Sequence, residues 1–270
     1  MKRRYRFERD PSRQFMGRVI MKWGGGLISD KSTLCTAYAD RISALAKCVG
    51  KLVSKGHEVI VVHGAGSFGH LRAREYKLSE GDIPGFDQED AVILVRKDMD
   101  HLHEIVLASL NTMDTFSHAP RDFVKNTGAK FTGDLDRFLR PGVHITFGDV
   151  VDCDPPLNFG ILSGDDLMLR LSVELPDVTH VIFAMGDTPG LMTTPGADGE
   201  LIPIWRVDDQ FSGQHEHGID VTGGIFLKTE RAAAISQHVE HVWFVDGLHT
   251  ERILEIVENG YTYGTRISNS

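Results

Sequence analysis

Residues 59–70 read Val59-Ile60-Val61-Val62-His63-Gly64-Ala65-Gly66-Ser67-Phe68-Gly69-His70. The β-branched run at the start predicts a strand that is covered on both faces, as strands of a parallel sheet are. The glycines that follow let the backbone come close to a ligand, and a helix that begins there would point its N–H groups at an anion. We therefore predict an anion-binding turn at the carboxyl end of a buried strand.

A second turn of this kind lies earlier in the chain. The short apolar run Val19-Ile20-Met21 ends at Lys22 and is followed by Gly24-Gly25-Gly26. Between the two turns, apolar residues recur at steps of three and four over residues 42–53, which is typical of an amphipathic helix. A strand, a helix and a strand with glycine at both strand ends predict a βαβ unit. Two glycine turns on neighbouring strands favour an extended polyphosphate site over tight turns alone.

The rest of the chain continues the alternation. Helices are predicted over 92–110, 167–175, 225–237 and 251–258, strands over 143–147, 178–184 and 242–245, a hairpin over 150–161 and a loop over 188–199. This order predicts an α/β fold with a mostly parallel central sheet and helices on both faces. We expect residues 1–18 to form an N-terminal extension and residues 19–270 to form a single domain.

The bulk composition excludes several classes of function. The 270 residues carry a formal net charge of −9, so non-specific nucleic-acid binding, which needs a basic surface, is not expected. The three cysteines are widely spaced and odd in number, which favours a reducing compartment, and we expect a cytoplasmic protein. No run approaches the roughly 18 apolar residues of a membrane span.

Two other nucleotide motifs fit poorly. Residues 64–69 formally match the dinucleotide pattern G-x-G-x-x-G, but the polar segment 79–88 and then a helix follow where a second strand with an acidic end is required. A dinucleotide-dependent oxidoreductase is therefore a minor alternative. The P-loop signature G-x-x-x-x-G-K-[ST] is absent from the sequence.

Ordered motifs along most of the chain resemble those of the amino-acid kinase superfamily. They are Lys22-Trp23-Gly24-Gly25-Gly26, Asp30-Lys31, residues 63–70, Gly148-Asp149, Ser163-Gly164-Asp165-Asp166, Asp220-Val221-Thr222-Gly223-Gly224 with Lys228, and Gly264-Thr265. Within the superfamily, Ser67-Phe68-Gly69-His70 is similar to the isopentenyl phosphate kinase branch. The resemblance implies an αβα sandwich with a substrate lobe to about residue 160 and a nucleotide lobe after it. It also implies ATP and Mg²⁺ as cofactors, a homodimer, and transfer of phosphate to isopentenyl phosphate.

The same resemblance implies a role for each matching residue. Lys22 and Lys228 would hold the ATP phosphates, Lys31 would stabilise the transition state, and Asp165 would organise the two ATP-binding lysines. The remaining assignments are backbone or lining positions: Gly24, Gly25, Gly26, Gly66, Asp187 and Gly224 on the ATP side, and Ala65, His70 and Gly164 on the side of the substrate phosphate. No residue is assigned as a metal ligand.

His70 is the residue that points to a phosphorylated acceptor, although fosfomycin-phosphorylating relatives carry a similar Phe-Gly-His. An acceptor that is already a phosphate is anionic and needs no general base, but it needs a donor that holds it in line against like-charge repulsion. A histidine that titrates near neutrality can give such a charged hydrogen bond. We therefore predict that His70 contacts the acceptor, although a packing role is the alternative for any one of the 13 histidines.

The chain departs from the family pattern in three places. Gly26 replaces a serine, Ala65 replaces a glycine, and residues 185–190 differ in length and in one acidic position. The last change leaves the nucleotide preference open. Two alternatives remain open as well: a kinase for another small phosphate or a phosphonate such as a fosfomycin-like compound, and a nucleotide-binding sensor or storage protein without turnover.

Overall fold

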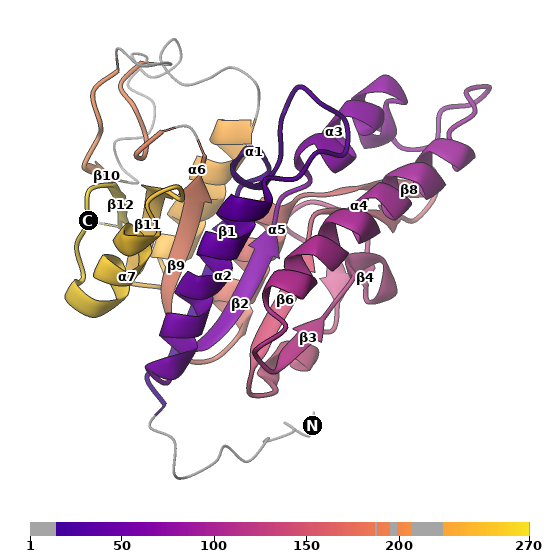
Figure 1. Cartoon of the computed structure of the whole chain (residues 1–270). Coiled ribbons are helices and arrows are strands. Elements are labelled where there is room, and N and C mark those ends of the chain that lie inside the picture. The colour runs from indigo at the N-terminus through magenta and orange to yellow at the C-terminus, as the bar shows by residue number, and fades with distance from the viewer. Residues whose placement is uncertain (1–14, 187, 195–198, 207–223, 270) are drawn as a thin grey trace.

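The computed structural model describes residues 15–186, 188–194, 199–206 and 224–269 (Figure 1). The strands are β1 (Arg18–Trp23), β2 (Glu58–His63), β3 (Thr115–Ser117), β4 (Val124–Lys125), β5 (Thr132–Gly133), β6 (Val143–Phe147), β7 (Asp149–Asp152), β8 (Phe159–Leu162), β9 (Val178–Met185), β10 (Ile204–Arg206), β11 (His241–Asp246) and β12 (Thr265–Ser268). The α-helices are α1 (Gly25–Ile28), α2 (Ala39–Ser54), α3 (Gly66–Glu75), α4 (Glu89–Ser109), α5 (Gly164–Glu174), α6 (Gly224–Ser236) and α7 (Thr250–Asn259). Short 3₁₀ turns are η1 (Leu78–Glu80), η2 (Pro120–Asp122) and η3 (Asp136–Leu139).

The central sheet has eight strands in the order β10-β12-β11-β9-β1-β2-β6-β3. Its pairs are parallel except β11 with β12, which is antiparallel. The predicted mostly parallel sheet is therefore confirmed. β1 lies between β9 and β2, and β2 lies between β1 and β6, so both are interior strands. Every residue of both strands is buried, as the β-branched run in β2 predicts.

Helices cover both faces of this sheet, so the predicted αβα sandwich is confirmed (Figure 1). One hydrophobic core joins α2, α4 and α7 to side chains such as Met21 and Val61. The other core joins α5 and α6 to the alternate side chains, such as Ile20 and Val62. Successive residues of a strand point to opposite faces, so each strand contributes to both cores.

This alternation decides where Lys22 points. Val19 and Met21 face the core under α2 and α4, whereas Ile20 faces the core under α5 and α6. Lys22 is two residues after Ile20 and therefore lies on the α5 and α6 face, at the carboxyl end of β1. The same rule places His63 on the opposite face, beside α4.

The structure also adds detail that the sequence pattern did not contain. The glycine turn after β2 is only Gly64-Ala65 long, because α3 already begins at Gly66 and His70 lies in its second turn. Arg18, the last residue of the expected extension, is the first residue of β1 and is buried, with its guanidinium bonded to Glu58. No helix among the described residues combines the length and the hydropathy needed to cross a bilayer.

Candidate active site

A cavity of about 400 Å³ lies at the carboxyl ends of β1 and β2, between α3, α4, the β7–β8 hairpin and the first turns of α5 and α6. Nine residues that the sequence assigns to the site line it: Lys22, Gly24, Gly25, Ala65, His70, Gly164, Asp165, Gly224 and Lys228. They come from four separate segments of the chain. The fold therefore brings most of the predicted site together in one place.

Two lysines and one aspartate form the charged end of the cavity. Lys22 Nζ lies 2.5 Å from Asp165 Oδ1, and Lys228 Nζ lies 3.4 Å from the same oxygen. The Asp165 side chain is only 6% exposed, so the carboxylate is shared by two cations in a poorly solvated place. This is the arrangement expected if Asp165 organises the two lysines, and that role stays a prediction.

The start of α5 fixes the position of Asp165. Ser163 is the N-cap residue, and its Oγ accepts a hydrogen bond of 3.1 Å from the Asp165 N–H. The carboxylate also lies in the first turn, where the helix dipole favours negative charge. The next residue, Asp166, accepts a hydrogen bond of 2.8 Å from Arg231 Nε of α6. Two adjacent acids of α5 therefore face two bases of α6.

Burial and charge shift the pKa values at this end. Desolvation lowers the pKa of Lys22 to about 8, although Asp165 opposes the shift. Burial alone would raise the pKa of Asp165, but the charges of Lys22 and Lys228 outweigh it and the pKa lies below its usual value. The ion pair is therefore intact at neutral pH.

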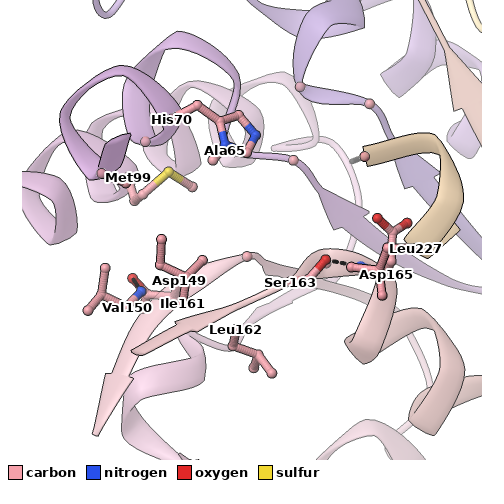
Figure 2. A pocket seen from close by; sticks show the side chains of 18 of the residues that line it. Ala65, His70, Met99, Asp149, Val150, Ile161, Leu162, Ser163, Asp165 and Leu227 are labelled. Carbon is pink, nitrogen blue, oxygen red and sulfur yellow. Dashed lines mark hydrogen bonds between the residues drawn. The ribbon is translucent and has the colours of Figure 1, made fainter. Parts of the chain in front are cut away.

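His70 lies on the wall of the cavity between the charged end and the opposite end (Figure 2). Desolvation lowers the pKa of its imidazole, and the positive charges of Lys22, Arg74 and Lys228 lower it further. Without a ligand the ring is therefore neutral near pH 7, which differs from the charged donor expected from the sequence. A bound phosphate dianion beside the ring would oppose these positive charges and raise the pKa again.

The other end of the cavity is apolar. Ala73 of α3 and Val95 and Met99 of α4 form one side of it, and Val150, Ile161 and Leu162 of the β7–β8 hairpin form the other. In Figure 2, Met99 faces Val150 and Ile161 across the cavity, while Asp165 and Ser163 lie at the far side. A molecule with an anionic head and a short hydrocarbon tail matches this division.

The two glycine turns touch each other. A Cβ at Gly25 would lie 2.4 Å from the Gly66 N atom, and one at Gly64 would lie 2.5 Å from the Gly25 N atom. Gly66 also has a φ of +51°, a backbone conformation that is unfavourable for residues with a Cβ atom. These glycines are thus required for the crossing of the turns, whether or not they also bind ATP. Gly66 and Gly26 do not line the cavity.

Lys31 and Asp187 are the two charged residues of the predicted site that the cavity lining does not include. Lys31 crosses Gly26: a Cβ at that glycine would lie 2.1 Å from the Lys31 Cε atom. The glycine that replaces the family's serine therefore leaves room for the lysine side chain. Asp187 and the segment 220–223 lie outside the described residues.

The described residues contain no group of three or more His, Cys, Asp or Glu side chains arranged to hold a metal ion. Mg²⁺ in kinases binds largely through phosphate oxygens and water, with one or two carboxylates. A Mg²⁺ that enters with the nucleotide would take its ligands mainly from phosphate oxygens and water.

The family resemblance implies that part of the helix over 92–110 lies against the substrate's hydrocarbon tail, but it does not say which side chains do so. Val95 and Met99 belong to the regular apolar stripe of α4, and this pattern alone predicts only that they are buried. Asp149 belongs to the motif Gly148-Asp149, for which the resemblance implies no role. It lines the cavity, and its buried carboxylate accepts a hydrogen bond of 2.9 Å from Arg121 Nη1. Burial raises the pKa of Asp149 to about 6.

Comparison with known proteins agrees with this geometry. The isopentenyl phosphate kinase of Thermoplasma acidophilum is 30% identical over 251 residues, which cover 90% of this chain and 97% of that protein. The isopentenyl phosphate kinase of Methanocaldococcus jannaschii is 28% identical over 230 residues, covering 78% and 85% of the two chains. The crystal structure of an isopentenyl phosphate kinase substrate complex superposes with a TM-score of 0.77 at 26% identity, over 93% of this chain and 100% of that one.

A family model also matches most of the chain. The model of the amino acid kinase family covers residues 17–246, which include both glycine turns, His70, Asp165 and Lys228. The sheet order, the shared carboxylate and the sequence match lead to one conclusion: this chain belongs to the amino acid kinase family.

Proposed function

We propose that this protein transfers the γ-phosphate of ATP to isopentenyl phosphate and forms isopentenyl diphosphate, a step of isoprenoid biosynthesis. The observation that carries the proposal is that His70 lies between a charged end and an apolar end of one cavity. A phosphate acceptor bound at His70 would have its hydrocarbon tail against Met99 and Val95. Its phosphate would then face the end that holds Lys22, Asp165 and Lys228.

The residues of the site would act by positioning and by charge neutralisation. In the transfer, an oxygen of the acceptor phosphate forms a bond to the γ-phosphorus, and the bond from that phosphorus to the β–γ bridging oxygen breaks. Lys22 and Lys228 would neutralise charge on the nucleotide phosphates. Lys31, whose side chain packs against Gly26, would stabilise the transferred group. Gly24, Gly25 and Gly224 would approach the nucleotide through their backbone. Mg²⁺ would supply further neutralisation on the phosphate oxygens when bound.

His70 would hold the acceptor. The neutral imidazole already has one N–H to donate, and the incoming dianion favours the charged form. The hydrogen bond would orient an acceptor oxygen toward the γ-phosphorus and offset repulsion between the two phosphates. Ala65 and Gly164 would face the same phosphate through backbone N–H groups.

The relatives support this proposal. The T. acidophilum and M. jannaschii proteins that resemble the chain over most of its length are isopentenyl phosphate kinases. We further propose a cytoplasmic homodimer, a substrate lobe before about residue 160 and a nucleotide lobe after it. These finer statements rest on the family resemblance and on the cysteine content.

A coupled assay of ADP release with isopentenyl phosphate and Mg²⁺-ATP tests the proposal. We expect turnover of isopentenyl phosphate with a kcat/KM at least about tenfold above that of a small phosphonate such as fosfomycin, because only the former fills the apolar end. Efficient turnover of the phosphonate without turnover of isopentenyl phosphate would contradict the proposed acceptor. Absence of turnover with either, despite ATP binding, would favour a sensor or storage role.

A further inference from the structure

A chain of hydrogen bonds links the residue just before the glycine turn after β2 to α4. The proposed chemistry does not use these bonds. His63, the last residue of β2, is fully buried, and its Nε2 lies 3.1 Å from the Nδ1 of His103 on α4. His103 Nε2 lies 2.7 Å from the Oγ of Ser117 on β3. At the other end, His63 Nδ1 lies 3.2 Å from the carbonyl oxygen of Gly64.

The carbonyl at one end fixes the direction of every bond in this chain. A carbonyl oxygen can only accept, so His63 Nδ1 carries the proton and donates to Gly64. His63 Nε2 must then accept, so His103 donates from Nδ1. His103 Nε2 accepts in turn from the Ser117 hydroxyl. Both imidazoles are therefore neutral Nδ1–H tautomers, and burial agrees with this because it lowers the pKa of His63 to about 3 and that of His103 to about 4.

A second histidine pair on the neighbouring strand has the opposite tautomers. His144 Nε2 lies 2.7 Å from the carbonyl oxygen of Arg140 and must donate to it. His144 Nδ1 therefore accepts from His118 Nε2, at 2.9 Å. Both of these rings are Nε2–H tautomers if they are neutral. This pair has no contact with the glycine turn and is a matched internal control.

The contact to Gly64 matters because of what lies on the other side of the same peptide group. In a trans peptide, the carbonyl and the following N–H point in opposite directions. The Gly64 carbonyl points to the buried His63 ring, so the Ala65 N–H points away from it, toward the cavity that Gly64 and Ala65 line. Among the described residues, the Ala65 N–H has no backbone acceptor.

This peptide group needs such a restraint. Position 64 must be glycine, because a Cβ there would lie 2.5 Å from the Gly25 N atom. Glycine permits many backbone conformations, so the peptide between Gly64 and Ala65 could rotate at low cost if nothing held it. The Gly64 N–H is already held by the Trp23 carbonyl at 2.8 Å, and His63 holds the carbonyl.

We propose that His63 is a positioning residue: it locks the Gly64–Ala65 peptide so that the Ala65 N–H points at the acceptor phosphate, and His103 and Ser117 lock His63 in the required tautomer. The inference rests on the proposed function for the identity of the acceptor, but not for the geometry of the peptide. His63 itself touches no substrate, because it lies beneath the cavity wall.

The first test needs no substrate. Long-range ¹H–¹⁵N spectra of the full chain labelled with ¹⁵N-histidine report each tautomer, and the variants His63→Phe, His103→Phe and His144→Phe assign the signals. We expect Nδ1–H for His63 and His103 and Nε2–H for His118 and His144. An Nε2–H tautomer or a protonated ring at His63 near pH 7 would overturn the inference, whatever the acceptor is.

The second test uses two substitutions that each keep one of the two ring functions. His63→Asn retains a donor close to the Nδ1 position, whereas His63→Gln retains only a group near the Nε2 position. We expect His63→Gln and His63→Phe to lower kcat/KM for the acceptor by about tenfold or more, with a smaller change in KM for ATP, because a misdirected backbone donor weakens transition-state stabilisation. His63→Asn should recover most of this loss.

The control is His144→Phe, which should lower thermal stability comparably while leaving kcat/KM unchanged. Equal losses in His63→Asn and His63→Phe would overturn the inference in favour of a purely structural histidine. If the wild type fails to turn over isopentenyl phosphate, the proposed function fails, and the tautomer measurement still decides this inference separately.

Discussion

At the scale of single residues, the candidate site depends on a carboxylate that holds two amines. Lys22 and Lys228 contact the same oxygen of Asp165, at 2.5 and 3.4 Å. We expect a nucleotide polyphosphate that enters this end to compete with Asp165 for both cations. His70 lies apart from this group, on the wall toward the apolar end.

The first prediction concerns His70. Replacement by Ala removes the side-chain donor for the acceptor phosphate, and we expect kcat/KM for isopentenyl phosphate to fall by about a hundredfold or more. Binding of ATP, measured separately by calorimetry, should change little. The exposed His238 provides a control, since His238→Ala should leave both quantities unchanged. A His70→Ala variant with a near-wild-type rate would exclude His70 from the reaction.

The second prediction concerns pH. The pKa of Lys22 is lowered to about 8, so the free enzyme loses this positive charge as the pH rises through that value. We therefore expect kcat/KM for ATP, which reports groups of the free enzyme, to decline above about pH 8. Asp165 raises the pKa of Lys22, so in Asp165→Asn the decline should begin at lower pH.

The control for this profile is Asp122→Asn, at an exposed position, which should leave the profile in place. A wild-type profile that stays flat to pH 10 would mean that the protonated Lys22 is not needed for ATP.

At the scale of elements, the sequence predicts the strands and helices well where their pattern is long. The β-branched run of β2 and the apolar stripes of α2 and α4 are local signals, and the structure confirms each of these elements. The short strand β10 and the antiparallel strand β12 have no comparable signal, because their pairing depends on distant residues. The contact between Gly25 and Gly66 also joins segments that are distant in the sequence. The sequence alone therefore cannot show whether glycine is needed there for this close contact or for binding ATP.

The third prediction concerns the contact between α5 and α6. Arg231 pairs with Asp166 at 2.8 Å and lies three residues after Lys228 on α6. If this pair sets the position of α6, Arg231→Gln should raise KM for ATP several-fold. It should also lower the free energy of unfolding by about 1–3 kcal/mol. This loss is smaller than for a fully buried pair, because Arg231 is partly exposed. Asp166→Asn should act similarly, and the double variant should be little worse than either single variant.

Thermal unfolding and steady-state kinetics measure the two effects. The exposed ion pair between Lys55 and Glu258 is the control, and Glu258→Gln should change neither stability nor KM appreciably. Full additivity of the Asp166 and Arg231 changes would show that the two side chains act independently.

At the scale of the whole molecule, the αβα sandwich brings the ends of β1 and β2, α4 and the β7–β8 hairpin around one cavity. The resemblance of ordered motifs predicts the family and most of the charged residues. The resemblance also implies that part of α4 faces the substrate's tail. The individual side chains could not be predicted, because one that faces a cavity and one that faces a core have the same pattern on α4. Only the position of the hairpin opposite α4 distinguishes them.

The fourth prediction follows from this enclosure. Met99 closes the apolar end opposite Ile161 and is 1% exposed, so Met99→Ala lengthens the space for a tail. We expect the ratio of kcat/KM for a longer prenyl phosphate to that for isopentenyl phosphate to rise about tenfold or more, at a stability cost of about 2 kcal/mol. Ile93→Ala is the control on the same helix, because Ile93 is 62% exposed. An unchanged ratio in Met99→Ala would place the tail elsewhere.

A crystal structure of the protein with isopentenyl phosphate and a non-hydrolysable ATP analogue would test the proposed role of His70 most directly. We expect a hydrogen bond of about 2.6–3.2 Å from His70 to the acceptor phosphate. We also expect the hydrocarbon tail between Met99 and Ile161, and the nucleotide phosphates on Lys22 and Lys228. An acceptor phosphate that lies away from His70, or a tail that leaves the cavity for solvent, would contradict the proposed binding of the acceptor.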